Sequence, residues 1–248
     1  MSERPRKLTI VPDAAALAQE AATRLLARLA EPRERLAVAL TGGSSPEGLY
    51  RLLASEPYRS QIPWQRVHWF WGDDRFVPQS DERSNAGAAR RLFLDRVPAP
   101  PATVHAIPTD AENADEAARR YEAELRAFYG ADQLDPGRPL FDVVLMGVGS
   151  DGHTASLFPG QPQVDETRRW VVGVPQAGLE PFVPRVSLTL PALASTRDML
   201  FLVTGRSKRE ILGRVLSDAD LPAARAHSQG DLVWLVDRDA APVRRDVA

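Results

Sequence analysis

One segment of the chain, residues 147–156, combines residue types that bind an anion with one that moves a proton. It follows the apolar run Phe141–Met146 and reads Gly-Val-Gly-Ser-Asp-Gly-His-Thr-Ala-Ser. Glycines let backbone N–H groups approach a ligand, and a helix beginning at the hydroxyl residues would add partial positive charge. Histidine transfers protons near neutral pH. The segment predicts a reactive anion site with Gly149, Asp151 and His153 at a strand-to-helix turn.

The same glycines satisfy the G-x-G-x-x-G pattern of dinucleotide-binding proteins, but their context argues against a dinucleotide. That pattern belongs in the first β-α turn, with a carboxylate about 20 residues later at the end of the next strand. Here it lies past the midpoint, and Asp165 and Glu166 precede the next strand-like run, Trp170–Val174. Asp151 and His153 would also lie where the pyrophosphate should bind. We therefore expect no nicotinamide cofactor, and no other cofactor.

A second candidate is the hydroxyl- and glycine-rich turn that follows the apolar run Leu36–Leu40 and leads into a helix expected to begin near Pro46. The turn lacks the Gly-Lys-Ser/Thr sequence of a nucleoside triphosphate site. Its amides and hydroxyls would suit a single phosphate, although a plain capped turn has the same composition. The residues predicted to bind there are Thr41, Gly42, Gly43, Ser44 and Ser45.

Charged residues lie at three further predicted strand boundaries. Asp73 and Arg75 follow the run Val67–Trp71, where a binding site and a solvated loop closed by ion pairs fit equally well. Lys208 falls in the first turn of a helix, where a cation opposes the macrodipole unless an anion joins it. Arg185 begins an apolar strand and is either a phosphate clamp or a surface cap. We expect Asp73, Arg185 and Lys208 to bind substrate.

These segments need a scaffold, and the chain alternates short apolar runs with helical patterns. Such alternation predicts βαβ units, hence one α/β domain over residues 1–248 whose mostly parallel, Rossmann-like sheet has helices on both faces. Helices are expected over residues 13–30, 46–54 and 115–129. The expected strands are Leu8–Val11, Leu36–Leu40, Val67–Trp71, Val104–Ile107, Phe141–Met146, Trp170–Val174, Val186–Leu190, Leu200–Thr204 and Leu232–Val236.

Composition narrows the class of protein further. The net charge is −2, which gives no general attraction to nucleic acid or to an anionic membrane. There is no cysteine, and no two histidines show the H-x-x-x-H spacing of a metal site, so we expect no metal. The basic N-terminus has no apolar leader and no run is long enough to span a membrane. We expect a cytoplasmic monomer or small homo-oligomer that binds a small molecule, with His68, His105 and His227 structural.

Four segments together, residues 40–46, 71–78, 147–159 and 185–189, resemble the glucosamine-6-phosphate isomerase/6-phosphogluconolactonase family over nearly the whole chain. The resemblance is strongest to the lactonases, through the segment that contains His153. It implies the α/β fold of the sugar-phosphate isomerase/CoA-transferase-like superfamily. It also implies hydrolysis of 6-phospho-D-glucono-1,5-lactone to 6-phosphogluconate in the oxidative pentose phosphate pathway. One departure is Asp74, where the family commonly has glutamate.

Under this hypothesis His153 is the general base that removes a proton from water, and Asp151 orients it. Arg75 or backbone amides of the glycine loop would stabilise the oxyanion that forms at the lactone carbonyl. The 6-phosphate would be held away from the reacting bond. The residues expected to hold it are Ser44, Ser45, Arg185 and Lys208. The alternatives are an enzyme of the glucosamine-6-phosphate deaminase/isomerase type and a non-catalytic sugar-phosphate-binding module.

Overall fold

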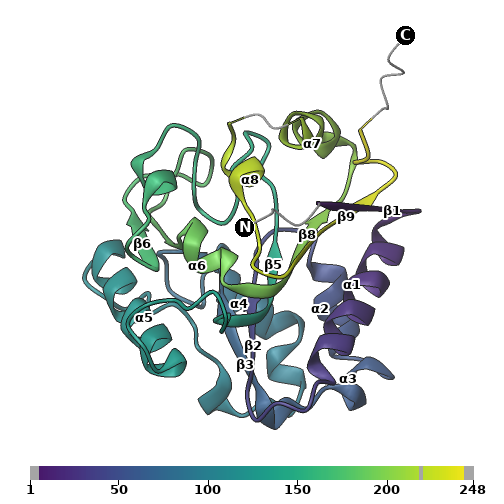
Figure 1. Ribbon diagram of the computed structural model, residues 1–248, viewed down its shortest axis with the longest axis horizontal. Coiled ribbons are helices and arrows are strands. Elements are labelled where there is room, and N and C mark those ends of the chain that lie inside the picture. Colours follow the sequence, from purple (N-terminus) through teal and green to yellow (C-terminus); the bar gives the residue numbers. More distant parts are fainter. Residues whose placement is uncertain (1–5, 218–219, 243–248) are drawn as a thin grey trace.

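The computed structural model describes residues 6–217 and 220–242, and its centre is a sheet of six parallel strands in the order β1-β9-β8-β5-β2-β3 (Figure 1). β2 and β5 are buried at every position, because helices lie over both faces of the sheet and these two runs are almost entirely apolar. The six strands are β1 (Lys7–Val11), β2 (Leu36–Leu40), β3 (Val67–Trp71), β5 (Phe141–Met146), β8 (Thr196–Val203) and β9 (Asp231–Asp237).

A second, antiparallel sheet lies beside the first and has the order β4-β7-β6. Its strands are β4 (Asp73–Arg75), β7 (Arg185–Leu188) and β6 (Val171–Val174). The amino-acid sequence predicts β6 and β7 in the mostly parallel sheet and does not predict β4. In β4, Asp73 pairs with Ser187 and Arg75 pairs with Arg185, so the small sheet brings two predicted site segments together.

Helices flank the sheets. α1 (Ala14–Leu29) packs against β1, β5, β8 and β9, whereas α5 (Ala114–Tyr129) packs against β6 and β7 on the other side of the molecule (Figure 1). Asp13 caps α1 by accepting the Ala16 N–H at 2.8 Å, and Asn113 caps α5 in the same way. The remaining helices are α2 (Glu47–Leu53), α3 (Tyr58–Gln61), α4 (Asn85–Leu92), α6 (Leu190–Ala194), α7 (Arg209–Leu216) and α8 (Pro222–Arg225).

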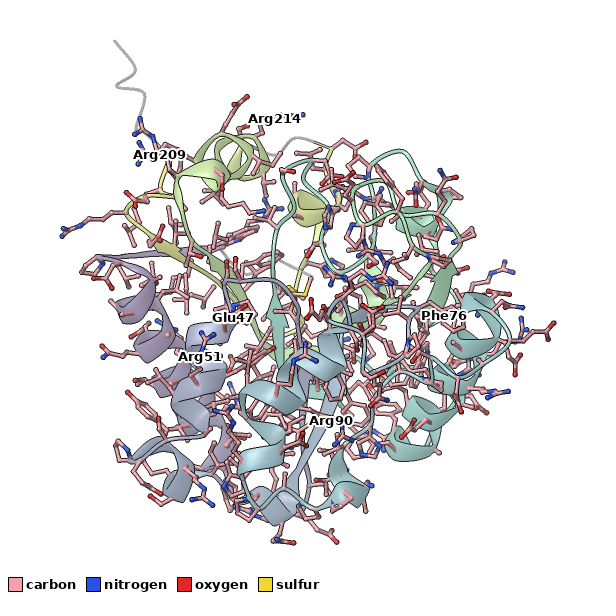
Figure 2. All side chains as sticks on the ribbon, turned by 180° about the vertical axis from the view of Figure 1, so that it is seen from behind. Glu47, Arg51, Phe76, Arg90, Arg209 and Arg214 are labelled. Atoms are coloured by element: carbon pink, nitrogen blue, oxygen red, sulfur yellow. The ribbon has the colours of Figure 1, made fainter. Side chains whose placement is uncertain are left out.

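Charged side chains of the helices face solvent, as Figure 2 shows for α2 and α4. On α2, Glu47 and Arg51 form an ion pair at 2.8 Å across one helical turn. Arg90 of α4 and the arginines 209 and 214 of α7 also lie on the outside. Over the part of the chain that the structure describes, no helix combines the length and the apolar character needed to cross a membrane.

Three predicted strands, β2, β3 and β5, are confirmed with the bounds expected, and the α/β class is confirmed with them. The predicted strand Val104–Ile107 is wrong. It makes one isolated bridge, between Val104 and Trp69, and one further backbone bond from His105 N to Trp69 O at 2.8 Å. The backbone of segment 104–107 therefore pairs with β3 at one bridge, and the side chain of His105 adds contacts with His68 and Phe70 of that strand.

The helix expected directly after His153 is also absent. Thr154 and Leu157 instead form an isolated bridge around a tight turn, in which Ala155 has a φ of 49°. The Thr154 hydroxyl donates to the Gly147 carbonyl at 2.8 Å and folds the chain back on itself. No helix N-terminus therefore faces an anion at this loop, and its chemistry must come from side chains and from turn amides.

Candidate active site

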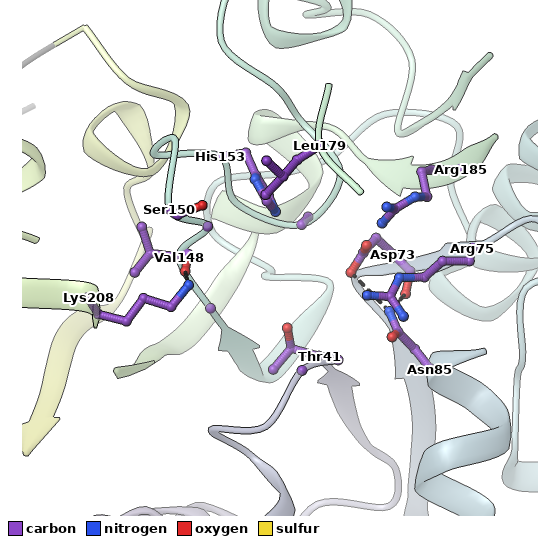
Figure 3. A pocket seen from close by; sticks show the side chains of 15 residues that line it. Thr41, Asp73, Arg75, Asn85, Val148, Ser150, His153, Leu179, Arg185 and Lys208 are labelled. Carbon is purple, nitrogen blue, oxygen red and sulfur yellow. Dashed lines mark hydrogen bonds between the residues drawn. The ribbon is translucent and has the colours of Figure 1, made fainter. Parts of the chain in front are cut away.

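A pocket of about 190 Å³ lies at the carboxyl ends of β8, β5, β2 and β3 (Figure 3). The chain leaves β2 for β3 in one direction and continues from β5 to β8 in the other, so β2 and β5 flank the point where strand order reverses. Such reversal points are where open α/β sheets bind ligands. The pocket is lined by Thr41, Gly42, Gly43, Asp73, Arg75, Asn85, Gly147, Val148, Gly149, Ser150, His153, Ala155, Leu179, Arg185 and Lys208.

His153 lines this pocket with one ring nitrogen already engaged. Its Nδ1 lies 2.6 Å from Asp151 Oδ1, and its backbone N–H donates to the same oxygen at 3.1 Å. An ionised carboxylate only accepts hydrogen bonds, so Nδ1 carries the proton and Nε2 is left as the acceptor. The ring lies over Gly149, where an added Cβ would be 2.0 Å from Nδ1. Glycine at 149 thus makes room for the histidine.

The His153 ring also contacts Phe158, with ring centroids 4.6 Å apart and the two rings tilted by 46°. Phe158 is buried in a small apolar cluster with Val174 and Ala177, against which Leu179 packs. The guanidinium of Arg185 lies 5.8 Å from the centre of the same phenyl ring. One aromatic side chain therefore supports both the histidine and the arginine of the pocket.

Asp151 does not line the pocket but sits behind His153. Burial acts to raise the pKa of Asp151, but the hydrogen bonds and charge of His153 outweigh it and leave that pKa below its usual value. The carboxylate is therefore ionised at neutral pH. It can orient the imidazole and stabilise its protonated form, as the acid of a catalytic triad does.

Three cationic side chains enter the pocket from separate elements. Lys208 reaches it from the turn before α7 and donates to the Val148 carbonyl at 2.8 Å. Arg185, 4% exposed, donates to the carbonyls of Val183 and Pro181 at 3.3 and 2.9 Å. Burial lowers the pKa values of Lys208 and Arg185. In Figure 3 Lys208 lies on one side of the pocket and Arg185 on the other.

Arg75 lies beside Arg185 in the paired strands β4 and β7. Its Nη1 donates to the Arg83 carbonyl at 2.5 Å, whereas its buried Nε has no partner within the described part of the chain. An unpartnered buried donor in a pocket is a candidate contact for a ligand oxygen.

The adjacent acids of β4 point to different places. Asp73 lines the pocket, and its Oδ2 accepts the Ser156 hydroxyl at 2.6 Å. Asp74, 1% exposed, accepts the backbone N–H groups of Arg75, Asn85 and Ala86. Burial raises the pKa of Asp74 to about 6, although these donors oppose the rise. Asp74 thus holds the start of α4 against β4.

The predicted turn after β2 is brought to the pocket only in part. Thr41, Gly42 and Gly43 line it, but Ser44 and Ser45 do not. The Ser45 hydroxyl is 2.9 Å from the Thr204 hydroxyl, which ties this turn to the end of β8. Ser44 and Ser45 as phosphate ligands therefore stay a prediction.

Several pocket residues were not predicted from the sequence, Asn85, Leu179 and the support residues Ser156 and Phe158 among them. Ser84 followed by Asn85 is a helix-start signal, since Ser84 caps α4 by accepting the Gly87 N–H. Nothing in that signal says that Asn85 faces a pocket. Over residues 6–217 and 220–242, no group of three or more His, Asp or Glu side chains is placed to hold a metal ion.

Comparisons with known proteins show the family of the chain. Residues 12–234 match the model of the family described as glucosamine-6-phosphate isomerases/6-phosphogluconolactonase. A 6-phosphogluconolactonase of Synechocystis sp. is 39% identical, with 88% of each chain covered. The crystal structure of the Thermotoga maritima 6-phosphogluconolactonase superposes with a TM-score of 0.81 and 29% identity, covering 94% of this chain and 100% of that one. A monomeric glucosamine-6-phosphate deaminase, 22% identical with a TM-score of 0.78 and coverage of 94% and 98%, shares the fold.

Proposed function

Since this chain belongs to the family of glucosamine-6-phosphate isomerases and 6-phosphogluconolactonases, we propose that it hydrolyses 6-phospho-D-glucono-1,5-lactone to 6-phospho-D-gluconate. The observation that supports the reaction most directly is His153, whose Nδ1 is held by Asp151 while its ring lines a pocket that also contains three cations. The proposal treats residues 1–248 as one catalytic domain. We also propose a cytoplasmic location and a place in the oxidative pentose phosphate pathway, and the similarity to 6-phosphogluconolactonases supports the second of these.

In the proposed reaction His153 Nε2 takes a proton from water as the water oxygen attacks the lactone carbonyl. The new C–O bond gives a tetrahedral oxyanion, which collapses by breaking the bond to the ring oxygen. The protonated His153 returns its proton to that leaving oxygen, which becomes the 5-hydroxyl. Asp151 keeps the imidazole in the required tautomer and offsets its transient charge.

Arg75 is the proposed donor to the oxyanion. Three amides of the glycine loop are already used within it: Gly149 N donates to His153 O, Gly152 N donates to Gly149 O and His153 N donates to Asp151. A side-chain cation is therefore better suited than these amides, and a donor of this kind contributes about 2.7–4 kcal/mol. Arg185 and Lys208, with the turn that starts at Thr41, are proposed to hold the phosphate.

The test compares two substrates in one assay. Fresh 6-phosphogluconolactone is followed by acid release, and glucosamine 6-phosphate by ammonia release. We expect acid release only, and unchanged turnover after dialysis against a strong chelator, because no step of the mechanism needs a metal. Ammonia release without lactone hydrolysis would favour the deaminase alternative. The 22% identical deaminase shares the fold with this chain but does not by itself support that activity.

A further inference from the structure

Asn85 stands in the pocket wall without a role in the reaction described above. It is the first residue of α4 and is 5% exposed. Its backbone N–H donates to Asp74 Oδ1 at 2.6 Å, and Asp74 Oδ2 accepts the Ala86 N–H at 2.9 Å and the Ser84 hydroxyl at 3.1 Å. These bonds fix the start of α4 against β4, so the side chain of Asn85 is presented to the pocket from a rigid position.

The orientation of the Asn85 amide follows from its neighbours. Nδ2 donates to the Asp73 carbonyl at 2.9 Å and lies 3.5 Å from Asp73 Oδ1. Both of these oxygens accept hydrogen bonds, so the amide nitrogen must face them and Oδ1 must point the other way. That oxygen lies over Gly42, where an added Cβ would come within 2.0 Å of it. Gly42 therefore leaves the space that the amide oxygen occupies.

Asn85 Oδ1 receives no hydrogen bond from any residue that the structure describes, although its side chain is more than nine-tenths buried and lines the pocket. The oxygen is open to the pocket, so its hydrogen-bond donor comes from solvent or from a ligand that enters. The neighbouring Asp73 uses one carboxylate oxygen for Ser156. On this side of the pocket the acceptors of Asn85 and Asp73 lie beside the guanidinium groups of Arg75 and Arg185, whereas Lys208 lies on the far side (Figure 3).

We propose that Asn85 Oδ1 accepts a hydrogen bond from a ring hydroxyl of the sugar lactone and thereby selects hydroxylated substrates over deoxy analogues. The inference rests on the proposed lactonase function. A fully ionised phosphate has no proton to donate to this oxygen, so a hydroxyl is the group of this substrate that matches it. A buried acceptor that loses its donor is left unpaired, and for that reason such sites reject analogues that lack the hydroxyl.

The test measures kcat/KM of wild type and Asn85→Ala on 6-phosphogluconolactone and on its 2-deoxy, 3-deoxy and 4-deoxy analogues. Wild type is expected to lose about 10- to 10²-fold on one analogue. Asn85→Ala is expected to lose a similar factor on the parent lactone and to treat that analogue and the parent alike. Asn113→Ala is the matched control, because Asn113 starts a helix away from the pocket and should leave the wild-type pattern intact.

Two results would overturn the inference while leaving the lactonase activity in place. One is a wild-type enzyme that hydrolyses all three analogues as well as the parent, a result that does not depend on whether the variant folds. The other is a folded Asn85→Ala enzyme that still discriminates among the analogues as wild type does. Absence of parent lactone hydrolysis by wild type would instead overturn the proposed function, and with it this inference.

Discussion

Two histidine–carboxylate pairs with the same nitrogen–oxygen distance lie in different regions of the molecule. His153 Nδ1 is 2.6 Å from Asp151 in the loop after β5, and His105 Nδ1 is 2.6 Å from Glu124 where segment 104–107 meets α5. The two imidazoles are similarly buried, with 19% and 14% of each side chain exposed. Neither the distance to the acid nor the burial of the ring distinguishes the two pairs.

The difference lies at the second ring nitrogen. His105 Nε2 is 2.8 Å from Nδ1 of His68, and the His105 ring stacks on Phe70 at 4.3 Å. His153 has Phe158 on one face, and its ring opens onto the pocket. An imidazole can act as a general base only when its acceptor nitrogen reaches a reactant. The environment of the second ring nitrogen therefore separates the pair that we propose to be catalytic from a structural pair with the same histidine–carboxylate geometry.

The largest expected effect comes from removing the two histidines in turn. His153→Ala should lower kcat by about 10²–10⁴-fold, because general-base assistance is lost. His105→Ala is the matched control and should retain kcat within a few-fold. Steady-state kinetics on the lactone, with circular dichroism to verify folding, checks both. A His153→Ala enzyme as active as His105→Ala would break the comparison.

A smaller effect is expected at Lys208 and Arg185, the proposed phosphate ligands, which line the same pocket as His153. Lys208→Met and Arg185→Met should each raise KM for the phosphorylated lactone by about 10- to 10²-fold, the range for a lost charge-assisted hydrogen bond. Unphosphorylated gluconolactone should be affected much less. If both substrates suffer equally in initial-rate measurements, these cations act elsewhere than on the phosphate.

The next largest effect on kcat is expected from the carboxylates that bond the two histidines. Asp151→Asn should reduce kcat about 10-fold, because the imidazole stays in the pocket but loses its fixed tautomer and orientation. Glu124→Gln makes the same change in the other pair and should leave kcat unchanged. The two variants are compared by single-turnover lactone hydrolysis. Equal rates for both would show that the His153 ring is held well enough by Phe158 and Gly149.

The pair formed by His105 and Glu124 should instead affect the free energy of unfolding. His105→Ala removes a side chain that bridges His68 and Glu124, and should lower the free energy of unfolding by about 1–3 kcal/mol. His153→Ala should change it by less, since Asp151 can be solvated through the pocket. Urea unfolding at pH 7.5 measures both. A larger loss in His153→Ala would reverse the assignment of the structural role.

The smallest effect concerns pH. Burial, with the nearby His105 and Arg35, lowers the pKa of His68 from 6.5 to about 4. Below pH 6.5 the unfolded chain binds a proton at His68 that the native protein does not bind until about pH 4. The free energy of unfolding should therefore fall as pH decreases through this window, and His68→Asn should flatten the fall. His227→Asn is the control at an exposed histidine, and equal slopes for both variants in urea titrations would contradict the prediction.

Sequence predicted the elements that are continuous apolar runs and missed those that depend on distant partners. β2 and β5 are buried on both faces, so their residues alone indicate strands. β4 reads Asp-Asp-Arg, has no apolar signal and exists because β7 pairs with it. The helix expected after His153 fails because Thr154 bonds back to Gly147, a contact that residue preferences do not contain.

The site divides in the same way. His153 and Asp151 are two residues apart, so their pairing could be expected from the loop alone. Asn85 and Gly42 meet only because α4 is held against β4 near the end of β2, which neither local sequence indicates. Gly42 suggested a backbone that approaches a phosphate, whereas its neighbour in the structure is a side-chain amide. Asn85 was therefore not predicted as a pocket residue, although Asp73 and all three cations of the pocket were.

The pairing of β1 with β9 affects the order in which the protein can assemble during its synthesis. Residues 7–11 are synthesised more than 200 residues before their partners at 233–237. At about 5–20 residues per second, the first strand waits on the order of ten seconds or more. Leu8 and Ile10 remain without a neighbouring strand during that time. The sheet must therefore assemble outward from β2, β3 and β5, and β1 is the last strand to pair.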